Sequence, residues 1–397
     1  MTSLLPSATL GHVAATRKTG DAAARVLSAE AFAQARDEIT QWDGYAPTPL
    51  VQFDALAKAI GVGKVLYKDE GPRFGLGSFK ALGGSYAAQR VLQREIARRT
   101  GQEVSLADIR TGKLAAESAQ ITLVSATDGN HGRSLAWGCQ RFGAPCRIYI
   151  HAEVSEGRAA AMRDLGAEVI RIDGDYDESV RLAKEEAEAN KWFVVSDTSW
   201  PGYSLPPLDV MSGYGVMTSE INEALEQAPT HVFLQGGVGG LAAGVAAGLR
   251  QHWGDASPRV VVVEPDLAAC LFESGKSGNA TNFAIAEETL MAGLSCGEPS
   301  PLAWEILAEE ASDFLTIPEI LVPAAVRLLA RPLDGDPAIE AGESGIAGLA
   351  ALIAARWDED LSARLGLDRN SRVLLIGSEG VTDPEIFAAI MEGRIAA

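Results

Sequence analysis

The residues best suited to chemistry lie in one stretch, KDEGPRFGLGSFKALGGSY, which runs from Lys68 to Tyr86. Glycines precede a Ser-Phe-Lys triplet, and a run with helical spacing follows it. A glycine-rich turn lets the backbone approach a ligand closely, and the start of a helix favours anions. The neighbours Phe79, Ala81 and Leu82 are apolar, and an ordinary solvated lysine would gain nothing beside them. We therefore take Lys80 as the first candidate for a reactive amine.

A second candidate is the glycine loop QGGVGG, Gln235 to Gly240, which follows the apolar segment HVFL and precedes an apolar helix. Consecutive backbone N–H groups at a helix start form a cradle for phosphate. No Gly-Lys-Ser/Thr follows the loop, and no acidic residue completes a dinucleotide fingerprint, so the pattern favours a ligand with a single phosphate. The alternative is a tight turn selected for packing. The candidate phosphate ligands are Gly236, Gly237, Val238, Gly239 and Gly240.

A third candidate is the turn SATDGNHG, Ser125 to Gly132, at the end of one predicted strand and the start of a helix. Side chains at the carboxyl end of a parallel sheet commonly face a ligand. Asp128 and Asn130 occupy such positions. Helix capping accounts for one of the two but not for the whole DGNHG pattern.

Composition limits the classes of function. The 397-residue chain carries a formal net charge of −19, which argues against nucleic acid or an anionic membrane as partner. No apolar run is long enough to span a bilayer and no secretory signal is recognisable, so a cytoplasmic protein is expected. Four cysteines and five histidines lack metal-ligand spacing, so no metal site is expected. The cysteines are expected to be buried thiols, with a Cys270–Cys296 pair left open as the alternative.

The order of predicted elements indicates an α/β protein. Apolar strands alternate with helices, which is typical of a parallel sheet covered on both faces, and the two alternating runs suggest a smaller α/β domain within a larger one. A Pro/Gly/Ser-rich loop, 197–209, separates the runs, and residues 273–315 are expected to be irregular. Expected strands are 65–70, 121–126, 146–150, 168–172, 193–196, 231–234, 260–264 and 373–376. Expected helices are 28–42, 80–99, 130–142, 155–165, 176–189, 213–226, 241–253, a helical stretch up to 330, 345–357 and one from Pro384.

A reactive lysine, a cradle for one phosphate and an asparagine turn without a metal site fit pyridoxal 5′-phosphate, which binds covalently to a lysine amine. Four motifs together resemble the fold type II, or β-family, pyridoxal-phosphate enzymes. They are SFK at Ser78–Lys80, the asparagine turn, QGGVGG, and GSEG at Gly377–Gly380. The resemblance implies two parallel-sheet α/β domains, the smaller inserted in the larger, with the large domain at 1–85 plus 200–397 and the small one at 86–199.

Longer motifs resemble the diaminopropionate ammonia-lyase family from about Thr48 to the C-terminus. They are YKDE-x-x-RFGLGSFKALGGSYA, ATDGNHGR, DTSWPGY, MAGLSCGEPS and SEGVTD. General fold type II dehydratases lack a carboxylate before the glycine of the asparagine turn, whereas here Asp128 occupies that position. Gly77 before SFK is a departure from the usual pattern and leaves the substrate detail open.

The resemblance implies an α,β-elimination on 2,3-diaminopropionate that yields pyruvate and two ammonia. Lys80 would bind the cofactor and remove the α-proton of the L isomer, and Asp128 would remove that of the D isomer. Asp197, in DTSWPGY, would hold the substrate amine or assist proton transfer, since the substrate carries an extra ammonium. An Asx turn before Pro201 is an equal alternative for Asp197.

The resemblance also assigns contacts to the cofactor and a form of assembly. Asn130 would bind the 3′ oxygen, the glycine loop the phosphate, and Ser378 the pyridine nitrogen, with Glu379 and Thr382 as alternatives to Ser378. Phe79 is a further cofactor contact. A homodimer acting on a small amino acid is expected, with the preference between D and L isomers left open. The alternative is a serine, threonine or hydroxyaspartate dehydratase of the same fold.

Overall fold

A computed structural model describes residues 4–15, 20–127, 129–174 and 176–395 of the chain. The chain divides into two compact units, which are described separately. Unit 1 contains Met1–Ala29, Pro47–Ser78 and Met217–Ala397, and unit 2 contains Glu30–Ala46 and Phe79–Val216. The domain ranges expected from the resemblance, 1–85 plus 200–397 and 86–199, stay a prediction.

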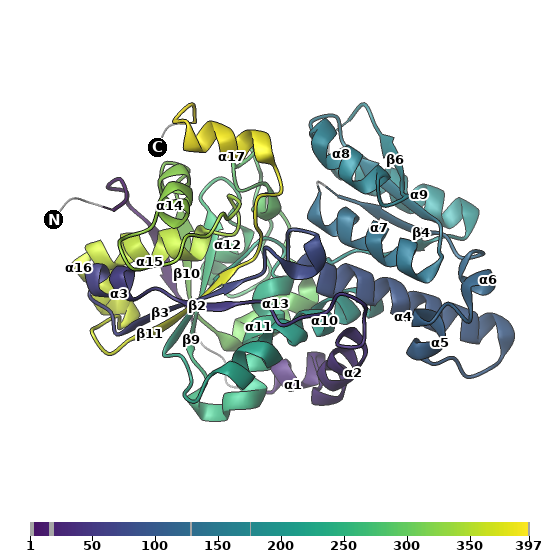
Figure 1. The fold of residues 1–397 in the computed structure, drawn as a ribbon, viewed down its shortest axis with the longest axis horizontal. Coiled ribbons are helices and arrows are strands. Elements are labelled where there is room, and N and C mark those ends of the chain that lie inside the picture. The colour runs from purple at the N-terminus through teal and green to yellow at the C-terminus, as the bar shows by residue number, and fades with distance from the viewer. Residues whose placement is uncertain (1–3, 16–19, 128, 175, 396–397) are drawn as a thin grey trace. The chain divides into compact units, whose positions relative to one another are not determined.

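Unit 1 is built on a seven-stranded sheet in the order β1-β10-β9-β8-β11-β3-β2 (Figure 1). The five central strands are parallel, and the short strands β1 and β2 close the two edges in antiparallel orientation. The strands are β1 (Gly11–Ala14), β2 (Leu50–Gln52), β3 (Lys64–Asp69), β8 (His231–Gln235), β9 (Arg259–Pro265), β10 (Ala311–Ile317) and β11 (Arg372–Gly377).

Helices cover the sheet of unit 1. One face carries a continuous apolar core in which Phe233, Val261 and Leu375 meet Leu349 and Ile353 of α15, all fully or almost fully buried. Apolar runs such as VVVV in β9 and VLLI in β11 are buried because both faces of the sheet are covered. The helices of unit 1 are α1 (Ala22–Val26), α3 (Asp54–Ile60), η1 (Arg73–Gly75), α11 (Gly240–Trp253), η2 (Gly254–Ala256), α12 (Cys270–Ser277), η3 (Ala292–Leu294), α13 (Pro301–Glu310), α14 (Leu321–Ala330), α15 (Ala347–Trp357), α16 (Glu359–Leu365) and α17 (Pro384–Met391).

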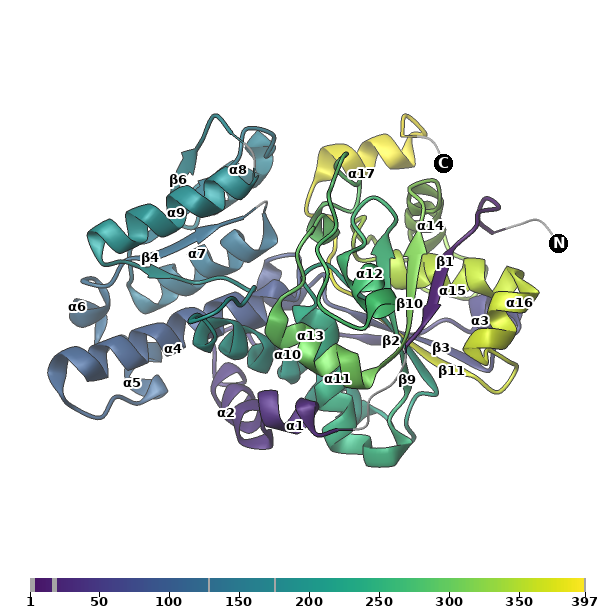
Figure 2. The ribbon, with the colours of Figure 1, turned by 180° about the vertical axis from the view of Figure 1, so that it is seen from behind.

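Unit 2 contains a four-stranded parallel sheet in the order β6-β5-β4-β7 (Figure 2). The chain moves outward through β4, β5 and β6 and then returns to place β7 beside β4, so α9 covers the face opposite to α7 and α8. The strands are β4 (Leu123–Ala126), β5 (Cys146–Ile150), β6 (Glu168–Arg171) and β7 (Phe193–Val194). The helices are α2 (Ala29–Ile39), α4 (Lys80–Thr100), α5 (Leu106–Arg110), α6 (Ala115–Ser118), α7 (Asn130–Phe142), α8 (Glu156–Arg163), α9 (Tyr176–Asn190) and α10 (Leu205–Ala224), of which α10 continues into unit 1.

Helix α4 packs unusually closely against its neighbours in unit 2. A Cβ at Gly84 would lie 2.6 Å from Ser134 Oγ of α7, and one at Gly138 would lie 2.8 Å from the Cα of Ser85. On α10, a Cβ at Gly213 would lie 2.2 Å from a carbonyl oxygen of α4. These distances are shorter than any real carbon contact, so the glycines allow the backbones to approach. The first turn of α4, which begins at Lys80, is therefore held between two helices.

The structure confirms the expected fold class, an α/β protein with two parallel-rich sheets. Two local expectations are wrong. Residues 273–315, expected to be irregular, contain the end of α12, all of α13 and most of β10. Helix α10 begins at Leu205, inside the expected loop, because Pro206 and Pro207 lie in its first turn, where the missing N–H groups have no intrahelical partner. Within the described residues, no helix has the length and apolarity that a membrane crossing requires.

Candidate active site

The candidate residues of unit 2 lie at the point where the strand order of its sheet reverses. Strands β4 and β7 are adjacent and parallel, and their connections leave in opposite directions. Ligands of open α/β sheets bind outside the carboxyl ends of such strands. The turn with Asn130 follows β4, and the segment with Asp197 follows β7. The fold therefore places two sequence-distant motifs at one edge of the sheet.

Lys80 and Asp197 form an ion pair in unit 2. Lys80 Nζ donates a hydrogen bond to Asp197 Oδ2, and both side chains are about four-fifths buried. Burial alone would raise the pKa of Asp197, but the positive charge of Lys80, the neighbouring His131 and the hydrogen bond from Lys80 hold it below its usual value. Asp197 is therefore a carboxylate at neutral pH. It can hold one ammonium group in place, as it does that of Lys80.

Two aromatic residues fix the loop that carries Asp197. The hydroxyl of Tyr203 accepts a hydrogen bond from the Ser196 N–H and donates one to the Val194 carbonyl, both at 2.9 Å. Trp200 pairs with Tyr203 through two backbone hydrogen bonds, and their rings stack at 3.8 Å. The loop is thus braced on both sides of Asp197. Sequence reasoning noted DTSWPGY as a motif but not this bracing, which depends on contacts within the loop.

His131 lies next to Asp197, and it was not singled out from the sequence. Its Nε2 is 2.9 Å from the Val195 carbonyl oxygen, and its Nδ1 is 3.9 Å from Asp197 Oδ2. A carbonyl can only accept, so Nε2 carries the hydrogen and Nδ1 is bare in the neutral ring. Within the described residues Nδ1 has no hydrogen-bond partner, although the side chain is 94% buried. Burial lowers the pKa of His131, Asp197 raises it and Lys80 lowers it, with a net decrease.

The remaining candidates of unit 2 surround Lys80 or lie beside it in sequence. Its Nζ is 5.4 Å from the centre of the Phe79 ring, which packs at 4.6 Å against Tyr214. Burial raises the pKa of Tyr214, so its phenol stays protonated. Asn130 is the first residue of α7 and is half-buried. Asp128, the proposed second base, lies outside the described residues.

In unit 1 the glycine loop follows β8 and opens α11. Gly237 and Gly239 have φ values of +65° and +96°, which favour glycine. Among the described residues, the N–H groups of Gly237, Val238 and Gly240 have no acceptor. A Cβ at Gly236 would lie 2.4 Å from Glu264 Cγ, so this position also requires glycine. Free amides at a helix N-terminus fit a phosphate group.

Glu264 lies next to the glycine loop and was not predicted as a site residue. It is fully buried at the end of β9 and accepts hydrogen bonds from the N–H groups of Leu271 and Phe272 at 3.1 and 2.7 Å. Burial raises the pKa of Glu264 to about 8, although these N–H groups oppose the shift. Its carboxyl group thus binds the first turn of α12, and its Cγ occupies the space beside Gly236.

Ser378 follows β11, which is the neighbour of β8 in the sheet of unit 1. Its side chain is buried, and the adjacent Glu379 forms an antiparallel bridge with Ser78. The N–H of Gly380 donates to the Gly77 carbonyl at 2.9 Å. The structure therefore places the GSEG motif directly beside the Ser-Phe-Lys triplet's first residue. Which side chain of this segment binds the cofactor stays a prediction.

A buried ionic network in unit 1 braces the segment that leads to Ser78, and sequence reasoning missed it. Arg73 makes two-pronged contacts with the carboxylates of Glu70 and Glu220, all four at 2.8 Å. Lys68 Nζ is 2.5 Å from Glu220 and 2.7 Å from the Thr48 carbonyl. Lys68, Glu70 and Arg73 are at most 1% exposed. The only local signal was the spacing of charges in YKDE-x-x-R.

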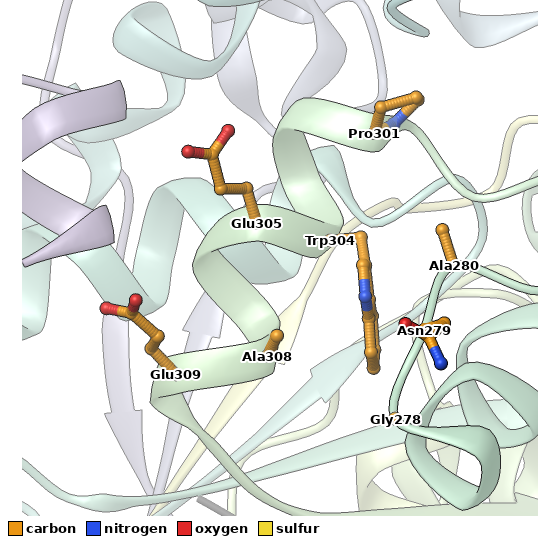
Figure 3. A pocket seen from close by; sticks show the side chains of 8 residues that line it. All are labelled: Gly278, Asn279, Ala280, Pro301, Trp304, Glu305, Ala308 and Glu309. Carbon is orange, nitrogen blue, oxygen red and sulfur yellow. The ribbon is translucent and has the colours of Figure 1, made fainter. Parts of the chain in front are cut away.

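Other features of the described residues add no second site. A depression on α13 is lined by Gly278, Asn279, Ala280, Pro301, Trp304, Glu305, Ala308 and Glu309 (Figure 3). Its two acids already have structural partners, because Glu305 pairs with Arg25 and Glu309 accepts the Ala22 N–H. The described residues contain no disulfide bond and no group of metal-binding side chains. The pairing of Cys270 with Cys296 is thus not present.

Comparison with known proteins gives a consistent result. Residues 41–379 match the family model "Pyridoxal-phosphate dependent enzyme". Diaminopropionate ammonia-lyase of Escherichia coli K12 is 39% identical over 360 residues, which cover 89% of each chain. A crystal structure of the holo form of that E. coli enzyme matches with a TM-score of 0.90 at 36% identity over 99% of each chain. Another, in complex with D-serine, matches with a TM-score of 0.89 at 35% identity over 98% of each chain.

Proposed function

Because the chain belongs to the pyridoxal-phosphate-dependent enzyme family, we propose that it is a diaminopropionate ammonia-lyase that converts 2,3-diaminopropionate to pyruvate and two ammonia. The observation that carries this proposal is 39% identity to a diaminopropionate ammonia-lyase along nine-tenths of both chains. The ion pair of Lys80 with Asp197 supports it, since this substrate has a second ammonium group to be held.

Pyridoxal 5′-phosphate supplies an electron sink for the charge that forms when the α-proton is removed. Lys80 would hold the cofactor covalently and, once its amine is free and neutral, would accept the α-proton of the L isomer. Asp128 accepts the α-proton of the D isomer. A carboxylate and an amine acting as two separate bases would let one enzyme use both isomers.

Asp197 holds a positive charge beside the reacting atoms. Beside Lys80 it is ionised at neutral pH, because the charge and hydrogen bond of Lys80 outweigh the effect of burial on its pKa. When the Lys80 amine is engaged elsewhere, an ammonium group of the substrate would take the place of that charge. The natural candidate is the β-ammonium of the substrate, which must remain protonated to leave as ammonia. The loop bracing by Tyr203 keeps the carboxylate in position.

The other candidate residues bind the cofactor. The free N–H groups of the glycine loop would hold the phosphate, with the positive end of the α11 dipole behind them. Asn130 would donate to the 3′ oxygen, Phe79 would pack beside Lys80, and Ser378 would offer a neutral hydroxyl to the pyridine nitrogen. A homodimer is part of the proposal, and size-exclusion chromatography with light scattering tests it.

The substrate assignment is tested by keto-acid release from D- and L-diaminopropionate, D- and L-serine, L-threonine and hydroxyaspartate. We expect the two diaminopropionate isomers to have the highest kcat/KM. The E. coli relative has been solved with D-serine, so slow turnover or inhibition by D-serine is compatible with the proposal. Faster turnover of serine, threonine or hydroxyaspartate than of both diaminopropionates would replace it with a dehydratase.

The Asp128→Asn variant distinguishes the roles of the two proposed bases, Lys80 and Asp128. Removal of a general base costs about 10²- to 10⁴-fold in rate, and we expect this loss for the D isomer while much of the activity on the L isomer remains. Equal losses on both isomers would show that Asp128 is not a second base.

Reduction with borohydride followed by peptide mapping locates the covalent attachment of the cofactor, and an unlabelled Lys80 would refute its role.

A further inference from the structure

His131 combines three properties that packing alone does not explain. Its ring is buried, its Nε2–H is fixed by the Val195 carbonyl, and its Nδ1 lone pair faces Asp197 Oδ2 at 3.9 Å with no partner in the described residues. Two acceptors that face each other in a buried place gain nothing from their proximity. A proton on Nδ1 would convert the same arrangement into an imidazolium paired with a carboxylate.

One carboxylate oxygen serves both neighbours. Asp197 Oδ2 accepts from Lys80 Nζ and is also the oxygen nearest to His131 Nδ1. While Lys80 is an ammonium, it neutralises Asp197 and repels a proton from His131. When Lys80 loses its charge, Asp197 would be left as an unpaired buried anion, which is strongly unfavourable. The missing positive charge can then be supplied by His131.

No other charged group of the described residues contributes to this balance. The effects on the His131 pKa come from burial, Asp197, Lys80 and the Val195 carbonyl. Helix α4, which packs on α7, has an uncharged residue next to the ring: a Cβ added at Gly84 would lie 3.5 Å from His131 Cε1. Lys80 and Asp197 are therefore the two described charges that set the protonation of His131.

We propose that His131 stores the proton that Lys80 must release, with Asp197 as the relay. An N–H bond of Lys80 breaks and an Nδ1–H bond of His131 forms, while the hydrogen bond from Nε2–H to Val195 is kept. Lys80 changes from positive to neutral, His131 from neutral to positive, and Asp197 remains an anion, so the net charge of the three groups is unchanged. His131 is thus a positioning residue that acts through Asp197 rather than on the substrate.

This inference rests on the proposed function in one respect: the reaction requires a neutral Lys80, since only a neutral amine attacks a carbonyl or accepts a proton. Its test contains no substrate. A failure of the diaminopropionate assay would therefore leave the proton transfer standing, and a failure of the proton transfer would leave the substrate assignment standing.

The test is a pH titration of the full-length, cofactor-free chain labelled with ¹⁵N-histidine. His131→Gln assigns the signal, and Lys80→Met removes the positive charge from Asp197. We expect His131 to stay neutral with hydrogen on Nε2 in the unsubstituted chain. In Lys80→Met its pKa should rise by at least about one unit, a tenfold gain in proton affinity, with the new proton on Nδ1. An unchanged pKa would overturn the proposal.

The relay is tested by adding Asp197→Asn to Lys80→Met. The increase in the His131 pKa should disappear, and an increase that persists would show that Asp197 is not the connecting group. Circular dichroism and the Tm check that each variant folds. If Lys80→Met does not fold, Lys80→Gln removes the same charge and keeps a polar end, with the same expected results.

A second measurement uses the unsubstituted lysine. The rate of Lys80 acylation at pH 7–8 reports its neutral fraction, and exposed Lys276 serves as the internal reference. In His131→Gln the amide can still donate to Val195 but cannot take up a proton, so Lys80 should react several-fold more slowly. The control is His231→Gln, which removes a buried histidine whose two nitrogens both have partners. Equal Lys80 rates in the His131 variant and the unsubstituted chain would contradict the storage role.

Discussion

Replacement of Glu220 by Gln should destabilise unit 1 severely. Glu220 accepts from Lys68 and Arg73, and burial would raise its pKa, but these two cations lower it below the usual value. With Glu70 as the second acid, the four buried side chains carry two positive and two negative charges. The glutamine keeps the shape of the side chain and removes one negative charge.

The magnitude follows from the charge that remains. Lys68 and Arg73 would share a single carboxylate in a place closed to water, and breaking a buried pair in this way costs about 3–5 kcal/mol. For a domain of 150–250 residues, 1 kcal/mol corresponds to about 2–4 °C, so the Tm of unit 1 should fall by roughly 6–20 °C. Because the folded pKa of Glu220 is depressed, its contribution is present above its unfolded pKa of about 4.3 and is lost at lower pH.

The assay is calorimetric and urea unfolding of the full chain at pH 7 and at pH 4. The matched control is Glu273→Gln, which removes the acid of an exposed 3.3 Å pair with Lys276 and should cost no more than about 1 kcal/mol. The double variant Glu220→Gln/Lys68→Met restores equal numbers of charges and should recover part of the loss. A Glu220→Gln chain within 1 kcal/mol of the unsubstituted protein at pH 7 would refute the reasoning.

Three further outcomes follow from the described contacts. Gly236→Ala should weaken pyridoxal phosphate binding at least about tenfold in a titration followed by absorbance, because its Cβ would lie 2.4 Å from Glu264 Cγ and displace the loop. Glu264→Gln should remove a pH dependence of stability. Because the folded pKa of Glu264 is about 8, the folded protein binds more protons than the unfolded chain between about pH 4.3 and 8. The unsubstituted protein should therefore lose up to about 1.4 kcal/mol of stability per pH unit over that range, measured from urea midpoints, and the variant should not. Tyr203→Phe should lose about 1–3 kcal/mol, because the Ser196 N–H and the Val194 carbonyl lose their partner, and should lower kcat more than it changes KM.

Much of the fold and several of the candidate residues could be predicted from local sequence patterns. The glycine loop was recognisable because its glycines are needed for backbone reasons that act within a few residues, as Gly237 and Gly239 show. The strands that alternate with α7 to α9 were predicted from short apolar runs, such as LV in β4 and IYI in β5. Strand β10 was missed because ASDFLTI mixes polar and apolar residues; Asp313 is buried there beside Arg259 and His12, which lie far away in the sequence.

Contacts between distant segments explain the rest of what the sequence did not reveal. Glu220 is 147 residues from Arg73, and His131 is 64 residues from the carbonyl that fixes its tautomer. Neither residue type is unusual where it stands, and a lone histidine after Asn130 has no metal-ligand spacing. Only the folded arrangement gives His131 an unpartnered nitrogen beside a carboxylate.

The strand order of unit 1 also constrains how the chain can fold during its synthesis. Strand β11 is the last to leave the ribosome, yet it lies between β8 and β3 and joins the two parts of the sheet. Strand β1, made first, must wait for β10. Unit 2 is nearly continuous in sequence, so a nascent chain can complete it while the strands of unit 1 are still unpaired. Chains that stall before Arg372 should therefore carry a folded unit 2 and expose the edges of β3 and β8, which makes them candidates for chaperone binding and aggregation.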